Sequence, residues 1–277
     1  MAATIPEMNS TTAGGLSRGI ASVIPLIAEP AGQWLASASD SALVELAPLC
    51  PDDPASAWFS VLSHEVLPYQ GVFLDPQSGH GWTEPRRIRR WLQSGAHSAV
   101  STGRTDDHVI TLLEYACWLL NQCRSSDPEP HLLRLRELLD DHLMRWIPAL
   151  AVSLALHDEV QASDQTRFYS HVGDLLVRRL CDVRSHLGPV EMVPNTIEVH
   201  SPNEGLRDLL TPIQCGVWLS RRVLASMAEE LGIQPMGERF AVLQQILAHS
   251  AHRDCLQRSL SQVVEHYEAL ANRLPVA

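Results

Sequence analysis

The chain has 277 residues, with 32 acidic and 21 basic side chains and a formal net charge of −11 at pH 7. Binding to bare nucleic acid or to an anionic membrane requires clustered positive charge, so this balance argues against both. All 21 basic residues are arginine. The absence of lysine excludes Schiff-base chemistry and the lysine-dependent phosphate loop of nucleotide hydrolases.

The sequence contains no recognisable targeting or membrane-spanning segment. The first fifteen residues lack the basic and apolar regions of a secretory signal, and the apolar stretch 147–156 is about half the length of a spanning helix. None of the six cysteines forms a C-x-x-C pair or a zinc-finger spacing. We therefore expect a cytoplasmic protein with reduced, mostly buried thiols.

The predicted elements are almost all helical. Residues 1–15 are rich in Ser, Thr and Gly and predict a flexible tail, whereas Asp53 followed by Pro54 predicts a capped helix start. Only residues 69–74 have strand character, and Pro148 predicts a kink or helix end near 145–147. The predicted helices cover residues 53–67, 83–91, 106–122, 129–156, 163–188, 203–210, 220–231, 237–248 and 252–274.

This order of elements predicts an all-α bundle of about ten helices in a single domain. The helix over 106–122 is apolar on nearly every side, which places it in the middle of the bundle. We expect a helical core over 16–188, a proline-containing loop over 189–202 that could act as a hinge, and C-terminal helices over 203–277 that pack on the core as a hairpin.

Two polar features interrupt apolar helices. His142 lies on an apolar stripe one turn before Trp146, and Asp107-His108 begins the apolar helix. A buried core histidine and a helix cap are the structural interpretations of these residues. The arginine run 86–90 is interpreted as a solvated helix face.

His157-Asp158 allows a different interpretation, an HD-type metal-dependent phosphohydrolase. Such an enzyme needs further histidine and aspartate ligands that converge on one metal ion. The residues available to complete this site are His108, His131, His142, Asp174 and Asp182.

Four segments together resemble the TorD/DmsD/NarJ family of redox-enzyme maturation chaperones. Residues 67–76 (LPYQGVFLDP) are similar to its aromatic-rich stretch, and 138–148 (LLDDHLMRWIP) to its F-L-x-x-H-L-x-x-W-x-P motif. Residues 105–108 (TDDH) resemble the second half of its E-P-x-D-H hallmark, with Arg104 and Thr105 in place of glutamate and proline. Residues 215–240 are similar to a C-terminal hairpin of some members, so the resemblance spans about residues 35–275.

The resemblance implies a non-enzymatic cytoplasmic chaperone with no catalytic, cofactor or metal site. Its implied partners are a molybdoenzyme catalytic subunit and that subunit's twin-arginine leader peptide; the chaperone assists cofactor insertion and prevents premature export. The implied state is a monomer or a domain-swapped dimer. A metal-dependent phosphohydrolase and a generic helical adaptor are the alternatives. The resemblance places client binding at Tyr69, Phe73, Asp107, His108, His142, Trp146 and Pro148.

Overall fold

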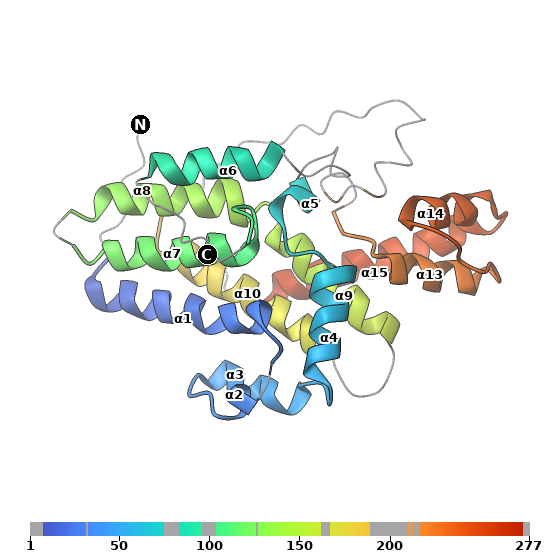
Figure 1. Cartoon of the computed structure of the whole chain (residues 1–277), viewed down its shortest axis with the longest axis horizontal. Coiled ribbons are helices and arrows are strands. Elements are labelled where there is room, and N and C mark those ends of the chain that lie inside the picture. Colours follow the sequence, from blue (N-terminus) through green and yellow to red (C-terminus); the bar gives the residue numbers. More distant parts are fainter. Residues whose placement is uncertain are drawn as a thin grey trace.

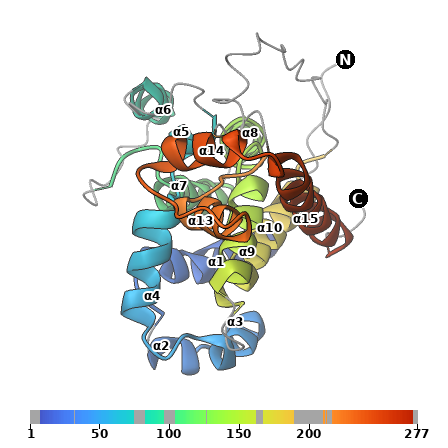
Figure 2. The same ribbon diagram turned by 90° about the vertical axis from the view of Figure 1, so that its right-hand side faces the viewer.

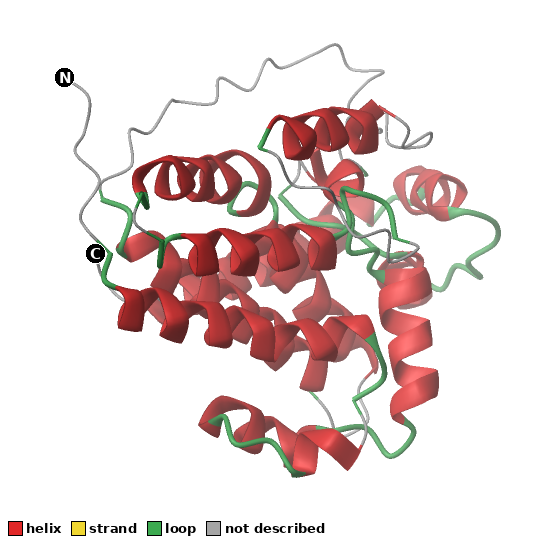
Figure 3. Cartoon of the chain, turned by 60° about the vertical axis from the view of Figure 1, so that its left-hand side comes forward, coloured by secondary structure: helices red, strands yellow, loops and turns green. Residues whose placement is uncertain are grey.

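The computed structural model is an all-α protein, which confirms the predicted fold class (Figures 1 and 3). No β-strand occurs among the residues that it describes. These residues are 8–31, 33–74, 83–95, 104–125, 127–161, 167–188, 210, 212 and 216–273.

The first helix begins earlier than the sequence predicted. α1 (Ser10–Ala28) starts after Asn9, whose side chain accepts a hydrogen bond of 2.9 Å from the backbone N–H of Thr12. Residues 10–15 are therefore helical, and their assignment to a flexible tail is wrong. The Asn9 cap satisfies one of the free N–H groups of the first turn, which offsets the low helix propensity of the following Ser, Thr and Gly residues.

The core is built around four helices. α1 packs against α7 (Val109–Gln122) and α10 (Phe168–Ser185), and α10 packs along α9 (Ile147–Gln161). α7 has buried side chains on nearly every side, as its sequence predicted, and only Glu114 and Asn121 are exposed. The short helices α2 (Gln33–Ala36), α3 (Ser41–Leu46) and η1 (Ala47–Leu49) follow α1.

The crossing of α9 and α10 depends on Gly173. A Cβ atom at this position would lie 2.8 Å from the Cα atom of Ala151, closer than real Cβ contacts. We expect Gly173→Ala to lower the free energy of unfolding by about 1–3 kcal/mol in urea denaturation, since the helices must separate. Gly15→Ala is the control, because Gly15 lies exposed in α1 with nothing within 4 Å of its Cβ position. That variant should gain about 0.5–1 kcal/mol, and equal stability of Gly173→Ala and wild type would contradict the close crossing.

The long predicted helix over 129–156 is broken in the structure. It consists of α8 (Glu129–Glu137), a π-helical turn η3 (Leu138–Leu143) and then α9, which begins at Ile147. Pro148 therefore occupies the first turn of a new helix. The missing N–H of proline costs no hydrogen bond there, because N–H groups of the first turn have no acceptor within the helix. The break changes the direction of the chain between His142 and α9.

A similar break occurs before the first motif of the resemblance. α4 (Pro54–Ser60) continues as the π-helical turn η2 (Val61–Glu65), and α5 (Gln70–Leu74) follows. The one segment with strand character in the sequence, residues 69–74, lies almost entirely within this short helix instead. α6 (Thr83–Ser94) comes next and corresponds to the predicted arginine-rich helix.

A second hydrophobic cluster joins the C-terminal helices to α9. It includes side chains from α13 (Arg221–Glu230), α14 (Arg239–Ala248) and α15 (His252–Arg273) together with Val152 and Leu156 of α9. α13 and α15 contact α9, and α14 packs against α13 and α15 (Figure 2). Ser220 caps α13 by accepting a hydrogen bond from the N–H of Val223. The predicted loop over 189–202, the predicted cap Ser163 and nearly all of the helix predicted over 203–210 lie outside the described residues.

Candidate functional site

Two motifs of the resemblance meet side by side in the structure. The backbone N–H of Gln70 donates to the carbonyl oxygen of Asp107 at 2.9 Å, and the N–H of Val109 donates to the carbonyl oxygen of Pro68 at 2.9 Å. These bonds form an isolated antiparallel bridge between Tyr69 and His108. The rings of these two residues meet edge to face, with centroids 4.8 Å apart. We call this contact of residues 68–71 with residues 105–109 the motif junction.

Asp107 holds the motif junction together from inside. Its side chain is buried, and one carboxylate oxygen accepts a hydrogen bond of 2.6 Å from the Thr105 hydroxyl. The other oxygen accepts a hydrogen bond of 3.3 Å from the N–H of Gly71. Both bonds are local to the junction, so the carboxylate positions the backbone of the two segments.

His108 caps the central helix. Its Nδ1 atom accepts a hydrogen bond of 3.1 Å from the N–H of Ile110, so the ring is held neutral with its proton on Nε2. Burial, followed by the charge of Arg104, lowers the pKa of His108 to about 4. Burial also raises the pKa of Tyr69, and the charge of Asp107 adds to this shift. Neither side chain is set up to exchange protons at neutral pH.

His142 lies next to the junction and is also neutral. The side-chain amide of Gln70 donates to its Nδ1 atom at 3.3 Å, because an amide nitrogen has no acceptor role. The Trp91 ring of α6 covers it, with centroids 4.4 Å apart. Burial lowers the pKa of His142 to about 4, and the charges of Arg87, Arg134 and Arg145 act in the same direction.

Phe73 and Trp146 belong to the hydrophobic core. Both are 0–1% exposed, and their rings lie 5.3 Å apart. The Trp146 Nε1–H donates to the carbonyl oxygen of His142 at 2.5 Å. Phe73 also faces Trp218, which connects this cluster to the C-terminal helices. A tryptophan with its N–H bonded and its ring enclosed is a packing residue.

The predicted client-binding residues thus lie in one region, but most of them are beneath its surface. Only Tyr69 and Pro148 are partly exposed. Sequence reasoning missed Gln70, Trp91 and Trp218, which complete the cluster from three different elements. Gln70 and Trp218 lie within the motifs of the resemblance, which was the only sequence signal for them. Trp91 had no such signal, because its contacts are with residues far away in the chain.

The His157-Asp158 pair has a structural role. The Asp158 carboxylate accepts a hydrogen bond of 2.7 Å from the N–H of Ser170 and so links α9 to the start of α10. Burial raises the pKa of Asp158 to about 7 and lowers the pKa of His157 to about 4. In the part of the chain that the structure describes, no three His, Cys, Asp or Glu side chains come close enough together to hold a metal ion. The ligand convergence that a metal-dependent phosphohydrolase requires is therefore not found there.

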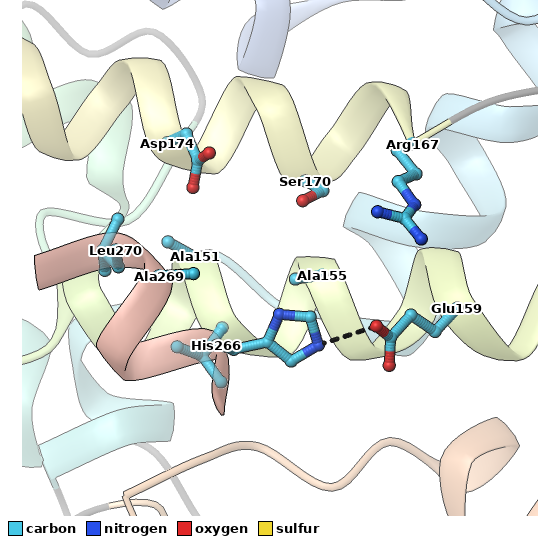
Figure 4. Close-up of a pocket in the computed structure, with 10 residues that line it drawn as sticks. Ala151, Ala155, Glu159, Arg167, Ser170, Asp174, His266, Ala269 and Leu270 are labelled. Carbon is cyan, nitrogen blue, oxygen red and sulfur yellow. Dashed lines mark ion pairs between the residues drawn. The ribbon is translucent and has the colours of Figure 1, made fainter. Parts of the chain in front are cut away.

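Two hollows lie near the C-terminal helices. The first, between α9, α10 and α15, has a volume of about 60 Å³ and contains an ion pair of 3.1 Å between His266 and Glu159 (Figure 4). This volume has room for about two water molecules and is too small for a substrate. The second is an open groove of about 630 Å³ along α14 and α15. Its apolar side chains are Leu247, Leu256, Leu260 and Val264.

Within the described residues, no helix combines the length and the apolar composition needed to cross a membrane. Residues 56–152, about a third of the chain, match the family model of the nitrate reductase delta subunit. Neither a curated protein nor a solved structure matches the chain. The matched segment runs from α4 into α9 and contains the motif junction, His142 and Trp146. This segment is therefore similar to the nitrate reductase delta subunit family, and the match supports the resemblance to the NarJ/TorD-type chaperones of molybdoenzyme maturation.

Proposed function

We propose that this protein is a chaperone that acts in the cytoplasm on a nitrate-reductase-like catalytic subunit. It binds the twin-arginine leader of that subunit, assists cofactor insertion and delays export until insertion is complete. The observation that carries the proposal is the family match over residues 56–152, which encloses the motif junction and the cluster beneath it. A twin-arginine leader has a basic start and an apolar segment. The net charge of −11 favours its approach in sign.

The motif junction is the proposed client site. Tyr69 supplies its partly exposed surface, while Asp107, His108 and the neighbouring His142 position that surface from below. Pro148, in the first turn of α9, is the other partly exposed residue of the predicted set. The side chains of Asp107, His108 and His142 are each hydrogen-bonded to a backbone N–H or to a side-chain amide. This arrangement favours a rigid binding surface over catalysis. The role of the buried members is therefore to fix where Tyr69 stands.

Tyr69→Ala tests this site. We expect the variant to bind a fluorescent twin-arginine leader peptide about tenfold more weakly in an anisotropy titration. The loss of the contact made by this partly exposed aromatic ring corresponds to about 1.4 kcal/mol of binding free energy. Phe59→Ala is the matched control, since Phe59 is an exposed aromatic residue on α4, outside the junction. Its affinity should equal that of wild type.

A third variant separates the two surfaces that could hold the leader. Leu260→Glu places a charge in the apolar groove of α14 and α15, where Leu260 is 40% exposed. If Leu260→Glu abolishes binding while Tyr69→Ala leaves it unchanged, the junction is not the leader site. The circular dichroism spectrum of each variant establishes that its helices are intact.

The identity of the client is accessible by affinity capture. Tagged protein isolated from its own cells under anaerobic, respiring conditions should retain a molybdoenzyme catalytic subunit that still carries its leader, identified by mass spectrometry. Repeated capture under inducing conditions without such a subunit would contradict the proposed function and favour a generic adaptor.

A further inference from the structure

The most concentrated positive charge among the described residues lies on α6. Arg86, Arg87, Arg89 and Arg90 fall within five residues of a chain whose net charge is −11. All four are exposed, whereas Ile88 and Leu92 of the same helix are 0% and 1% exposed and face the core. The helix therefore presents an arginine-rich side to solvent.

This helix is held firmly in place. Arg89 forms an ion pair of 2.5 Å with Asp106 at the start of α7. The Trp91 ring is enclosed between the Arg134 guanidinium, 3.6 Å from its centroid, and the His142 ring. Because Arg89 and Trp91 attach this helix to other elements, the orientation of its exposed arginines is fixed relative to the motif junction.

Positive charge from a second element adds to this side. Arg145, in the turn after η3, is exposed and lies three residues beyond His142, which α6 covers. We call Arg86, Arg87, Arg90 and Arg145 the arginine face.

Most neighbouring carboxylates are already engaged. Asp106 pairs with Arg89, and Asp140 pairs with Arg136 and Arg184. Among the described residues, Arg86, Arg90 and Arg145 form no ion pair. Like charges spaced three and four residues apart on a helix are unfavourable, so the face gains stability when an anionic partner covers it.

We propose that the arginine face docks an acidic segment of the mature client subunit. This inference rests on the proposed function and adds the chemistry of a second contact. The guanidinium groups project from an exposed helix and are spread along it, with about 6 Å between positions four residues apart. That spacing matches a run of carboxylates on a protein surface, whereas a single phosphate requires donors that converge.

The positive charge of the arginine face distinguishes the leader of the client from its acidic segment. The basic start of a twin-arginine leader is repelled by the arginine face, so the leader and the acidic segment bind different surfaces. Together they would fix the orientation of the client on the chaperone.

The test uses a labelled sixteen-residue peptide of alternating Glu and Ser, with a twin-arginine leader peptide measured in parallel. We expect Arg86→Gln/Arg90→Gln to bind the acidic peptide about tenfold more weakly than wild type and to bind the leader peptide unchanged. Arg178→Gln/Arg253→Gln is the matched control, because both arginines are exposed, form no ion pair among the described residues and carry the same total charge. Equal weakening in the two double variants would overturn the inference, since it would reflect net charge alone.

Further outcomes separate this inference from the proposed function. Wild-type protein that binds the acidic peptide but not the leader supports the arginine face and contradicts leader binding. The reverse result overturns the arginine face and leaves the proposed function standing. Complete displacement of the acidic peptide by micromolar inorganic pyrophosphate would also overturn the inference, because it would indicate a small-anion site.

Discussion

Stability should fall steeply as the pH is lowered from 6.5 to 4. Burial lowers the pKa of His108, His142 and His157 from 6.5 to about 4 in the folded protein. Between these pH values the unfolded chain binds a proton at each histidine and the folded protein does not, so protonation favours unfolding. The contribution of the neutral histidines is complete above pH 6.5 and is lost as the pH falls toward 4.

Asp158 acts in the opposite direction. Burial raises its pKa from 3.8 to about 7, so in the same range the folded protein holds a proton that the unfolded chain has released. The net difference is about two protons, equivalent to a slope of about 2.7 kcal/mol per pH unit. Urea denaturation at pH 6.5, 5.5 and 4.5 measures this slope. From pH 6.5 to 7 the slope should shrink toward zero, because the histidines of the unfolded chain and Asp158 of the folded protein both lose their protons in this range.

A single substitution tests the assignment of these protons. His142→Gln removes one of the three neutral histidines and should lower the slope by about 1.4 kcal/mol per pH unit, whatever its effect on stability at pH 7. His186→Gln is the control, since His186 is exposed at the end of α10. An unchanged slope in His142→Gln would show that this histidine is protonated in the folded protein.

The helical elements could be predicted because their signals are local. The Asp53-Pro54 start, the helix over 220–231 and the nearly all-round apolar sequence of α7 each depend on a few adjacent residues, and the structure bears out all three. The errors arose where distant contacts decide. Residues 69–74 have strand-forming side chains, yet their backbone has only the single bridge to His108.

The candidate site shows the same limit. An apolar stripe that contains His142 and Trp146 has the same spacing whether it lines a groove or faces the core. What decides between them is the covering element, and here Trp91 of α6 and Phe73 of α5 close over these residues. Both come from separate helices, so no pattern within residues 138–148 contains this information.

Trp146→Ala should cause a loss of stability of about 3–5 kcal/mol in urea denaturation. The indole is completely buried, its ring packs on Phe73, and its N–H donates to the carbonyl oxygen of His142. Truncation opens a cavity and leaves that carbonyl without its donor. Trp146→Phe keeps an aromatic ring against Phe73 and loses only the hydrogen bond and part of the volume, so about 1–2 kcal/mol should be lost.

The two variants also decide what the tryptophan of this motif does. If it is a packing residue, the fraction of Trp146→Phe that remains folded should bind the leader peptide with the wild-type dissociation constant. The buried position would be contradicted if fully folded Trp146→Phe bound the leader peptide at least tenfold more weakly while its free energy of unfolding fell by less than about 1 kcal/mol. Such a result would mean that α5 and α6 open to admit the client, and Phe73 and Trp146 would then be contact residues as the resemblance implies.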